Sequence, residues 1–141
     1  MLARDALAAF RADYGRRTAS IEARWIWVKL GFFRIPVPNP GHLLAHDLHH
    51  AILGAPPTLA GEAQVGVFEL RTGCANALVW FLCAGSVLIG LFQRPRSVFR
   101  WWRAYRDCKT LYRHPELERL LELDVEVLRE RVGAPSLTKR V

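Results

Sequence analysis

A run of 19 residues without a charged side chain, from Cys74 to Phe92, most constrains how this chain can fold. Apolar surface of that size must be covered by other parts of the protein or by lipid. Nineteen helical residues are just long enough to cross the hydrocarbon core of a bilayer. Small and polar residues within the run, such as Asn76, Gly85 and Ser86, are equally compatible with a helix packed inside a protein. We favour a buried or membrane-dipping helix, and a transmembrane span is the alternative.

Outside this run, apolar side chains recur every three or four residues, which is typical of helices with one buried face. The stretch 35–41 contains three prolines and cannot be helical, because proline lacks the backbone N–H that a helix needs. The predicted helices include 3–14, a helix from Thr18 or Ser20 to about Phe33, 42–53, a helix capped by Thr58, 95–113 and 115–132. We therefore expect residues 1–141 to form a single all-α domain of about six helices.

The net charge of +7 is concentrated at the start of the chain and in the segment 94–114, which holds seven basic residues and one acidic residue. Trp101, Trp102, Tyr105 and Tyr112 share one side of the helix predicted there. A basic amphipathic helix with tryptophan and tyrosine suits an anionic membrane surface. No recognised nucleic-acid-binding motif accompanies it, so we expect no nucleic-acid partner. A solvated face above aromatic core contacts is the alternative.

The three cysteines form no paired motif, which argues against a disulfide scaffold and against a zinc ribbon. Cys74 and Cys83 lie in the uncharged run and are interpreted as small core residues. The first residues lack the long apolar stretch of a secretory signal. The expected location is therefore cytoplasmic, with peripheral association at the inner face of the membrane.

Four histidines and an aspartate lie within the nine residues from His42 to His50. On a helix, where each residue turns by about 100°, His46, His50 and Asp47 fall within an arc of about 100°. His46 and His50 are one turn apart, the spacing with which two imidazoles hold one metal ion, and Asp47 offers an oxygen ligand beside them. A metal site is the favoured interpretation, and a polar helix face without a metal is the alternative.

A further ligand must come from another element, and Glu62 is the candidate. It follows the Pro56–Pro57 break by about one turn, and an antiparallel helix after that break would return it to the histidine helix, placing the site between two helices. Glu69 lies within about 20° of Glu62 around such a helix and is expected to orient a ligand. His49 lies on the far flank from Asp47 and is a candidate for contacting substrate or transferring a proton.

The pattern H-D-x-x-H-x11-E, formed by His46 to His50, eleven further residues and Glu62, matches the signature of the coenzyme Q biosynthesis protein 4 family. The run from Gly61 to Glu69 is similar to that family's G-E-(x5)-F-E segment. The run from Val127 to Gly133 resembles its usual C-terminal helix end. The central match covers about 25 residues, and the order of elements agrees over roughly two thirds of the chain.

This resemblance implies an all-helical fold and a divalent metal, taken as zinc, with His46, Asp47, His50 and Glu62 as its ligands. It implies a role in ubiquinone or related prenylquinone biosynthesis, by decarboxylation coupled to hydroxylation of a prenylated hydroxybenzoate. In such a reaction we expect His49 or Glu69 to relay the proton. A non-catalytic prenyl-lipid-binding scaffold that organises a biosynthetic complex is the alternative. A prenyl tail requires an apolar cavity. The expected partners are a prenylated quinone precursor, the membrane surface, other quinone-biosynthesis enzymes and, as a homodimer, a second copy of the chain.

Overall fold

A computed structural model describes residues 1–14, 24–30, 33–38 and 42–136. Within these ranges it contains six α-helices, a 3-10 helix (η2) and one β-hairpin. The elements are α1 (Ala3–Tyr14), β1 (Trp25–Leu30), β2 (Phe33–Pro38), α2 (Leu43–Leu53), α3 (Leu59–Thr72), α4 (Ala77–Gln93), α5 (Pro95–Ala104), η2 (Leu117–Glu122) and α6 (Val125–Val132). The predicted helical architecture is confirmed, and the hairpin is an addition to it.

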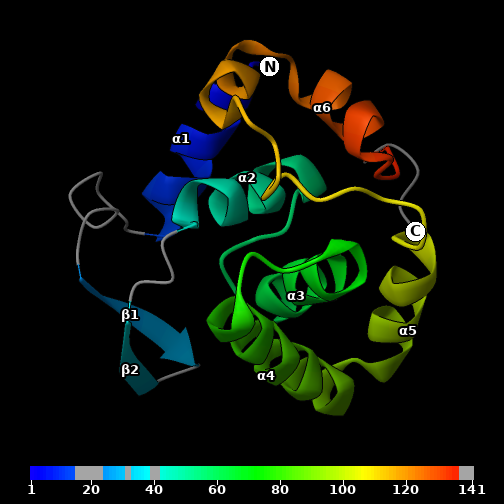
Figure 1. Cartoon of the computed structure of the whole chain (residues 1–141). Coiled ribbons are helices and arrows are strands. Elements are labelled where there is room, and N and C mark those ends of the chain that lie inside the picture. Colours follow the sequence, from blue (N-terminus) through cyan, green and yellow to red (C-terminus); the bar gives the residue numbers. More distant parts are fainter. Residues whose placement is uncertain (15–23, 31–32, 39–41, 137–141) are drawn as a thin grey trace.

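The helices α2 and α3 lie at the centre of the molecule (Figure 1). On one side α2 contacts α1 and α6, while α3 packs against α4 and α5. The core between them is apolar and includes Leu48, Ile52, Val65, Phe68 and Leu128, each fully buried. The chain start is joined to the last helix by a salt bridge of 2.7 Å between the Met1 amino group and Asp124. This packing fixes α2, which carries the histidine cluster, between α1 and α3.

The helix predicted from Thr18 or Ser20 to about Phe33 is wrong where the structure describes it, because residues 25–30 form a strand. That strand pairs with β2 in antiparallel register, so that Trp25 lies opposite Pro38 and Trp27 lies opposite Pro36. Aromatic and β-branched residues favour strands, and two strands leave room for prolines at an edge. The predicted positions 18–23 and 31–32 lie outside the described residues.

Two predicted helices are shorter than expected. The segment 95–113 is helical only to Ala104, and the chain then runs through turns and extended backbone to the next element. The segment 115–132 is divided into η2 and α6 by Leu123 and Asp124, both in extended conformation. Asp124 accepts a hydrogen bond of 2.8 Å from the Glu126 backbone N–H and so begins a new helix.

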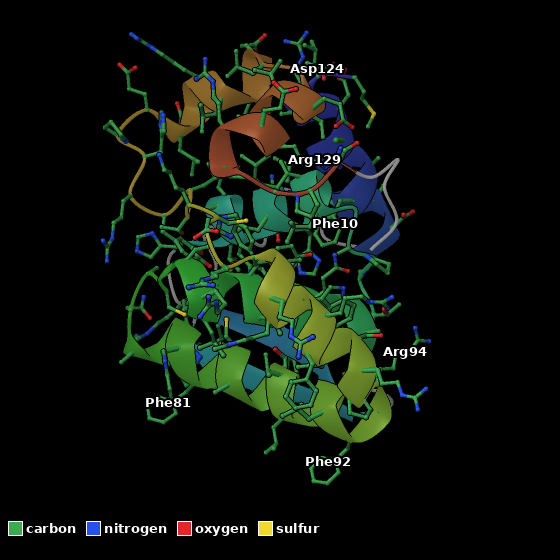
Figure 2. All side chains as sticks on the ribbon, turned by 90° about the vertical axis from the view of Figure 1, so that its right-hand side faces the viewer. Phe10, Phe81, Phe92, Arg94, Asp124 and Arg129 are labelled. Carbon is green, nitrogen blue, oxygen red and sulfur yellow. The ribbon has the colours of Figure 1, made fainter. Side chains whose placement is uncertain are left out.

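The helix α4 has the composition of a buried helix but exposes much of its surface. Its buried residues are Val79, Cys83 and Gly90. Phe81 and Phe92 are 68% and 84% exposed and point away from the rest of the molecule (Figure 2). None of the helices in the described part of the chain is long and apolar enough to span a membrane. The exposed apolar side chains of α4 are thus not covered by the other described elements.

Two glycines of α4 are expected to respond oppositely to alanine. A Cβ at Gly90 would lie 2.6 Å from the Cβ of Ala63, whereas a Cβ at Gly85 meets no atom within 4 Å. Gly90→Ala should therefore push α4 away from α3 and lower the free energy of unfolding by about 1–3 kcal/mol. Gly85→Ala should raise it by roughly 0.5–1 kcal/mol, because alanine favours helix. Urea unfolding of both variants measures this; equal effects would contradict the described α3–α4 packing.

Candidate metal centre

The turn between α2 and α3 determines where the first turn of α3 lies relative to the histidines of α2. Gly54 ends α2 in the left-handed conformation, with φ of 61°, where glycine is favoured. Thr58 then caps α3 by accepting a hydrogen bond from the Gly61 N–H. A Cβ at Gly61 would lie 1.8 Å from the Pro56 carbonyl oxygen, so only glycine fits at this close approach. These residues place Glu62, in the first turn of α3, opposite the histidines of α2.

Three of the predicted ligands meet between α2 and α3. The ligand atoms of His46, His50 and Glu62 all lie within 4.8 Å of one another. One oxygen of Glu62, Oε2, is 3.5 Å from Nε2 of His46 and 3.5 Å from Nε2 of His50. These separations are longer than a good hydrogen bond, and the group could hold a metal ion.

The other ring nitrogen of each histidine is already bonded. His46 Nδ1 lies 2.9 Å from Glu69 Oε1, and His50 Nδ1 lies 3.1 Å from the Ala55 carbonyl oxygen. Both partners are acceptors, so each Nδ1 carries a proton and donates it. The Nε2 atoms are thereby the ones available to a metal, which is the tautomer that metal-ligating histidines adopt when a second group orients them.

Two buried atoms of this group lack a hydrogen-bond partner among the described residues: His50 Nε2 and Glu62 Oε1. His50 is almost fully buried, and the Phe10 ring stacks on its imidazole with centroids 4.5 Å apart. Leaving a buried polar atom without a partner is costly in a folded protein. A cation at this place would satisfy both atoms, so the residues fit the metal that the motif implies.

Glu69 is the centre of a buried hydrogen-bond network behind the site. Its Oε1 accepts hydrogen bonds from His46 Nδ1, from His49 Nδ1 at 2.8 Å and from the Tyr112 hydroxyl at 2.8 Å. Its Oε2 accepts a hydrogen bond of 3.0 Å from the Cys83 thiol. Glu69 is fully buried, and these donors compensate for the burial of its charge. The predicted role of Glu69 in orienting a ligand agrees with this position.

The histidines and glutamates of the site shift one another's pKa values in favour of the charged forms. Burial would lower the pKa of His46, but the carboxylates of Glu69 and Glu62 outweigh it and raise that pKa well above its usual value. Burial would likewise raise the pKa values of Glu62 and Glu69, and their interactions with the histidines lower both instead. Both carboxyl groups are therefore ionised near neutral pH, as metal binding and orientation require. A metal ion that binds His46 Nε2 would displace the proton that the raised pKa of His46 keeps there.

Asp47 is not brought into the group formed by His46, His50 and Glu62. It is almost fully buried, and its Oδ2 accepts a hydrogen bond of 3.0 Å from Arg11 Nε of α1. His46 and His50 thus meet Glu62 of α3, while Asp47 takes part in an ion pair with α1. That Asp47 is a metal ligand stays a prediction from the motif.

His49 is buried with both ring nitrogens engaged. Its Nδ1 donates to Glu69, and its Nε2 accepts a hydrogen bond of 3.1 Å from the Leu111 backbone N–H. Burial lowers the pKa of His49 despite the neighbouring Glu69 carboxylate, so its imidazole is neutral. Through these two hydrogen bonds His49 links the 105–116 segment to Glu69. The predicted proton transfer through His49 stays a prediction.

Three residues of the site do not follow from the local pattern. Tyr112 and Cys83 donate to Glu69, and Arg11 pairs with Asp47. Arg11 belongs to α1 and Cys83 to α4, whereas Tyr112 lies in the segment between α5 and η2. Only the helical period could have hinted at Cys83, since it lies on a face of the uncharged run with Val79 and Gly90.

Two histidines and one glutamate form the ligand set of catalytic zinc sites, in which further positions remain open to water or substrate. The arrangement can therefore bind a divalent ion and present it to a second molecule. Comparisons with protein-family models, with curated proteins and with solved structures find no match to this chain.

Proposed function

We propose that this chain is a metal-dependent enzyme of ubiquinone or related prenylquinone biosynthesis, with zinc held by His46, His50 and Glu62. The supporting observation is the ligand group itself, with both Nε2 atoms directed by fixed hydrogen bonds at the other nitrogen. The substrate class, a prenylated hydroxybenzoate, follows from the resemblance of the H-D-x-x-H-x11-E pattern. The reaction we propose is hydroxylation of the ring carbon with dioxygen as the two-electron oxidant, with loss of the ring carboxylate as carbon dioxide and reduction of dioxygen to hydrogen peroxide.

A bound zinc ion would act as a Lewis acid that stabilises negative charge on a substrate oxygen. Around it, Glu69 holds the His46 ring in place, and Phe10 shields one face of His50. Zinc does not change its oxidation state, so the electrons for an oxygen-dependent step would come from the electron-rich phenol. The apolar cavity for the prenyl tail stays a prediction.

An assay of carbon dioxide release tests the proposed enzymatic function. Wild-type protein loaded with zinc is expected to release carbon dioxide from a prenylated hydroxybenzoate, and Glu62→Ala should lose this activity while keeping its circular dichroism spectrum. Glu116→Ala, at an exposed glutamate, is the control. Full activity of Glu62→Ala would contradict metal catalysis. Substrate binding by the wild type without carbon dioxide release would favour the non-catalytic scaffold.

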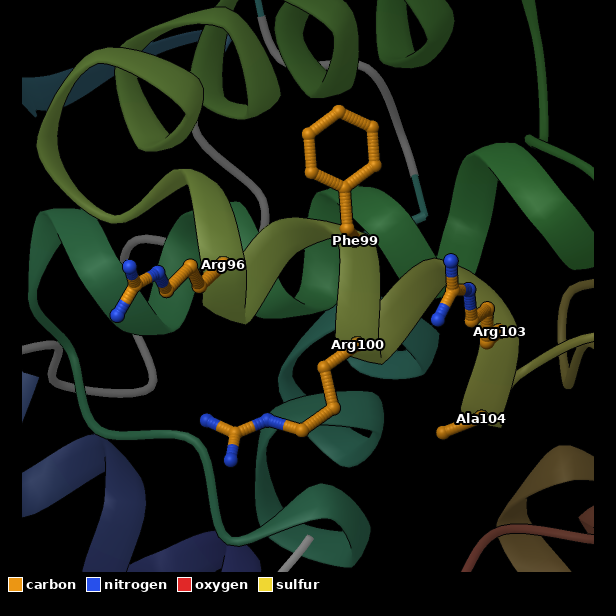
Figure 3. A pocket seen from close by; sticks show the side chains of 5 residues that line it. All are labelled: Arg96, Phe99, Arg100, Arg103 and Ala104. Atoms are coloured by element: carbon orange, nitrogen blue, oxygen red, sulfur yellow. The ribbon is translucent and has the colours of Figure 1, made fainter.

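Peripheral membrane association is the second part of the proposal, and the α4–α5 surface supports it. Trp80, Phe81, Leu88 and Phe92 of α4 are exposed, as is Phe99 of α5. A shallow hollow on α5 is lined by Arg96, Phe99, Arg100, Arg103 and Ala104 (Figure 3). Apolar side chains beside arginines match the interface of an anionic bilayer.

Vesicle binding tests this surface through its charge. Each basic residue close to an anionic bilayer contributes about 1 kcal/mol, so a triple variant Arg96→Gln/Arg100→Gln/Arg103→Gln should bind phosphatidylglycerol vesicles about 100-fold more weakly. A control with the same charge change, Arg4→Gln/Arg119→Gln/Arg131→Gln, alters exposed arginines outside α4 and α5 and should bind as the wild type does. Equal weakening in both would show that only net charge matters and would contradict a docking surface on α5.

A further inference from the structure

Tyr112 reaches the metal centre from the segment between α5 and η2, which belongs to none of the helices and strands. Its hydroxyl donates a hydrogen bond of 2.8 Å to Glu69 Oε1, the oxygen that also accepts from His46 Nδ1 at 2.9 Å. The preceding residue, Leu111, donates its backbone N–H to Nε2 of His49 at 3.1 Å. At two adjacent positions, the segment thus contacts buried residues that lie behind the metal ligands.

The surroundings of Tyr112 fix its ring and make its hydroxyl a donor. The ring stands edge-on to the imidazoles of His49 and His42, with centroids 5.1 Å and 5.8 Å away. Burial, and then the nearby Glu69 carboxylate, raise the pKa of the hydroxyl far above its usual value, so the hydroxyl keeps its proton. The fixed ring therefore directs a proton-bearing hydroxyl at Glu69.

The orientation of the Glu69 carboxylate depends on the donors around it, because the side chain is fully buried. Cys83 of α4 holds Oε2 at 3.0 Å, while Oε1 is held by Tyr112 together with His46 and His49. Hydrogen bonds to a charged acceptor are stronger than those between neutral groups. Without the Tyr112 hydroxyl, Oε1 loses one such bond, and the position that it imposes on the His46 ring is less tightly defined.

We propose that Tyr112 is a positioning residue of the metal centre, which strengthens zinc binding by holding Glu69 where it directs His46 Nε2 at the ion. Tyr112 acts through Glu69 rather than as a ligand. Groups that orient a metal ligand typically contribute 10–100-fold to metal affinity. Tyr112 is one hydrogen bond further from the ion than Glu69, so we expect an effect of about tenfold, at the lower end of that range. This role rests on the proposed metal site but not on the proposed reaction.

Zinc titration against a competing chelator compares two variants that each lose one hydrogen-bonded phenol hydroxyl. The matched control is Tyr105→Phe, because the Tyr105 hydroxyl accepts from Gln64 Nε2 at 2.9 Å, outside the bonds of Glu69. Tyr112→Phe should bind zinc about tenfold more weakly than the wild type, whereas Tyr105→Phe should bind it equally well. Both variants should unfold at lower urea concentrations, because each loses a hydrogen bond inside the protein.

Two further readouts separate positioning from a general loss of stability. Cobalt in place of zinc reports ligand geometry through its visible absorption spectrum, which should change in Tyr112→Phe and not in Tyr105→Phe. Zinc should also slow hydrogen exchange at the Leu111 backbone N–H of the wild type, because coupling between the ion and the segment is reciprocal. At equal zinc occupancy, Tyr112→Phe should show less of this protection.

The outcomes distinguish the role of Tyr112 from the metal site and from the reaction. Zinc affinity of Tyr112→Phe equal to or higher than that of the wild type, or an equal loss in Tyr105→Phe, would overturn the positioning role alone. A folded wild type that binds no zinc would overturn the metal centre and this role together. Zinc binding that depends on Tyr112, without release of carbon dioxide from a prenylated hydroxybenzoate, would support this role and contradict only the proposed reaction.

Discussion

Substituting His50 by alanine is expected to reduce zinc affinity by about 100-fold or more. A structural zinc site provides roughly 10–16 kcal/mol from four ligands, which is about 3 kcal/mol for each. His50 Nε2 is one of the three ligand atoms that meet between α2 and α3, and it lacks a hydrogen-bond partner among the described residues. Competition with a fluorescent chelator measures this affinity. The substitution also removes the ring's hydrogen bond to the Ala55 carbonyl oxygen and its stacking on Phe10, so circular dichroism must show that the variant is folded.

An exposed histidine supplies the control for this result. His114 lies outside the site and accepts a hydrogen bond from the Glu116 backbone N–H. His114→Ala should therefore bind zinc as the wild type does. If both variants lost affinity equally, zinc would be binding to surface histidines rather than between α2 and α3.

Replacing Glu69 by glutamine is expected to reduce zinc affinity by 10–100-fold without removing a ligand. Glutamine keeps the shape of the side chain, and its amide oxygen can still accept from His46. It lacks the negative charge that raises the pKa of His46 and strengthens the imidazole as a ligand. Its amide nitrogen would meet the Cys83 thiol in place of Oε2. Isothermal titration calorimetry gives both the affinity and the number of sites, and that number should remain one.

A surface substitution separates this effect from a general loss of charge. Glu130→Gln changes an exposed glutamate of α6 and should leave zinc affinity unchanged. Glu69→Gln with wild-type affinity would contradict the orienting role that the His46 contact assigns to this residue.

The parts of the site that lie within one helical pattern could be predicted from the sequence. The spacing of His46 and His50 places them on one face of a helix, and Glu62 meets them because the Gly54–Thr58 turn reverses the chain. The residue type of Thr58 alone predicts that it caps α3, and its hydrogen bond from the Gly61 N–H confirms this. Such features depend on residues close together in the sequence, for which helix geometry is a sufficient guide.

Features that depend on packing between distant elements could not be predicted. The arc of about 100° that holds His46, His50 and Asp47 does not say which neighbour each residue faces, and α1 supplies Arg11 to Asp47. Tyr112 reaches Glu69 from a segment predicted to be helical. The run from Trp25 to Leu30 is apolar at five of six positions, so its period does not distinguish a strand from a buried helix.

The metal content of the protein as purified, without chelator and without a metal-affinity step, tests the central claim most directly. Elemental mass spectrometry should find about one divalent ion, zinc, for each wild-type chain and almost none in His46→Ala. Circular dichroism must show that both proteins are folded. A folded wild-type protein with almost no bound metal, even after incubation with zinc, would contradict the metal centre formed by His46, His50 and Glu62.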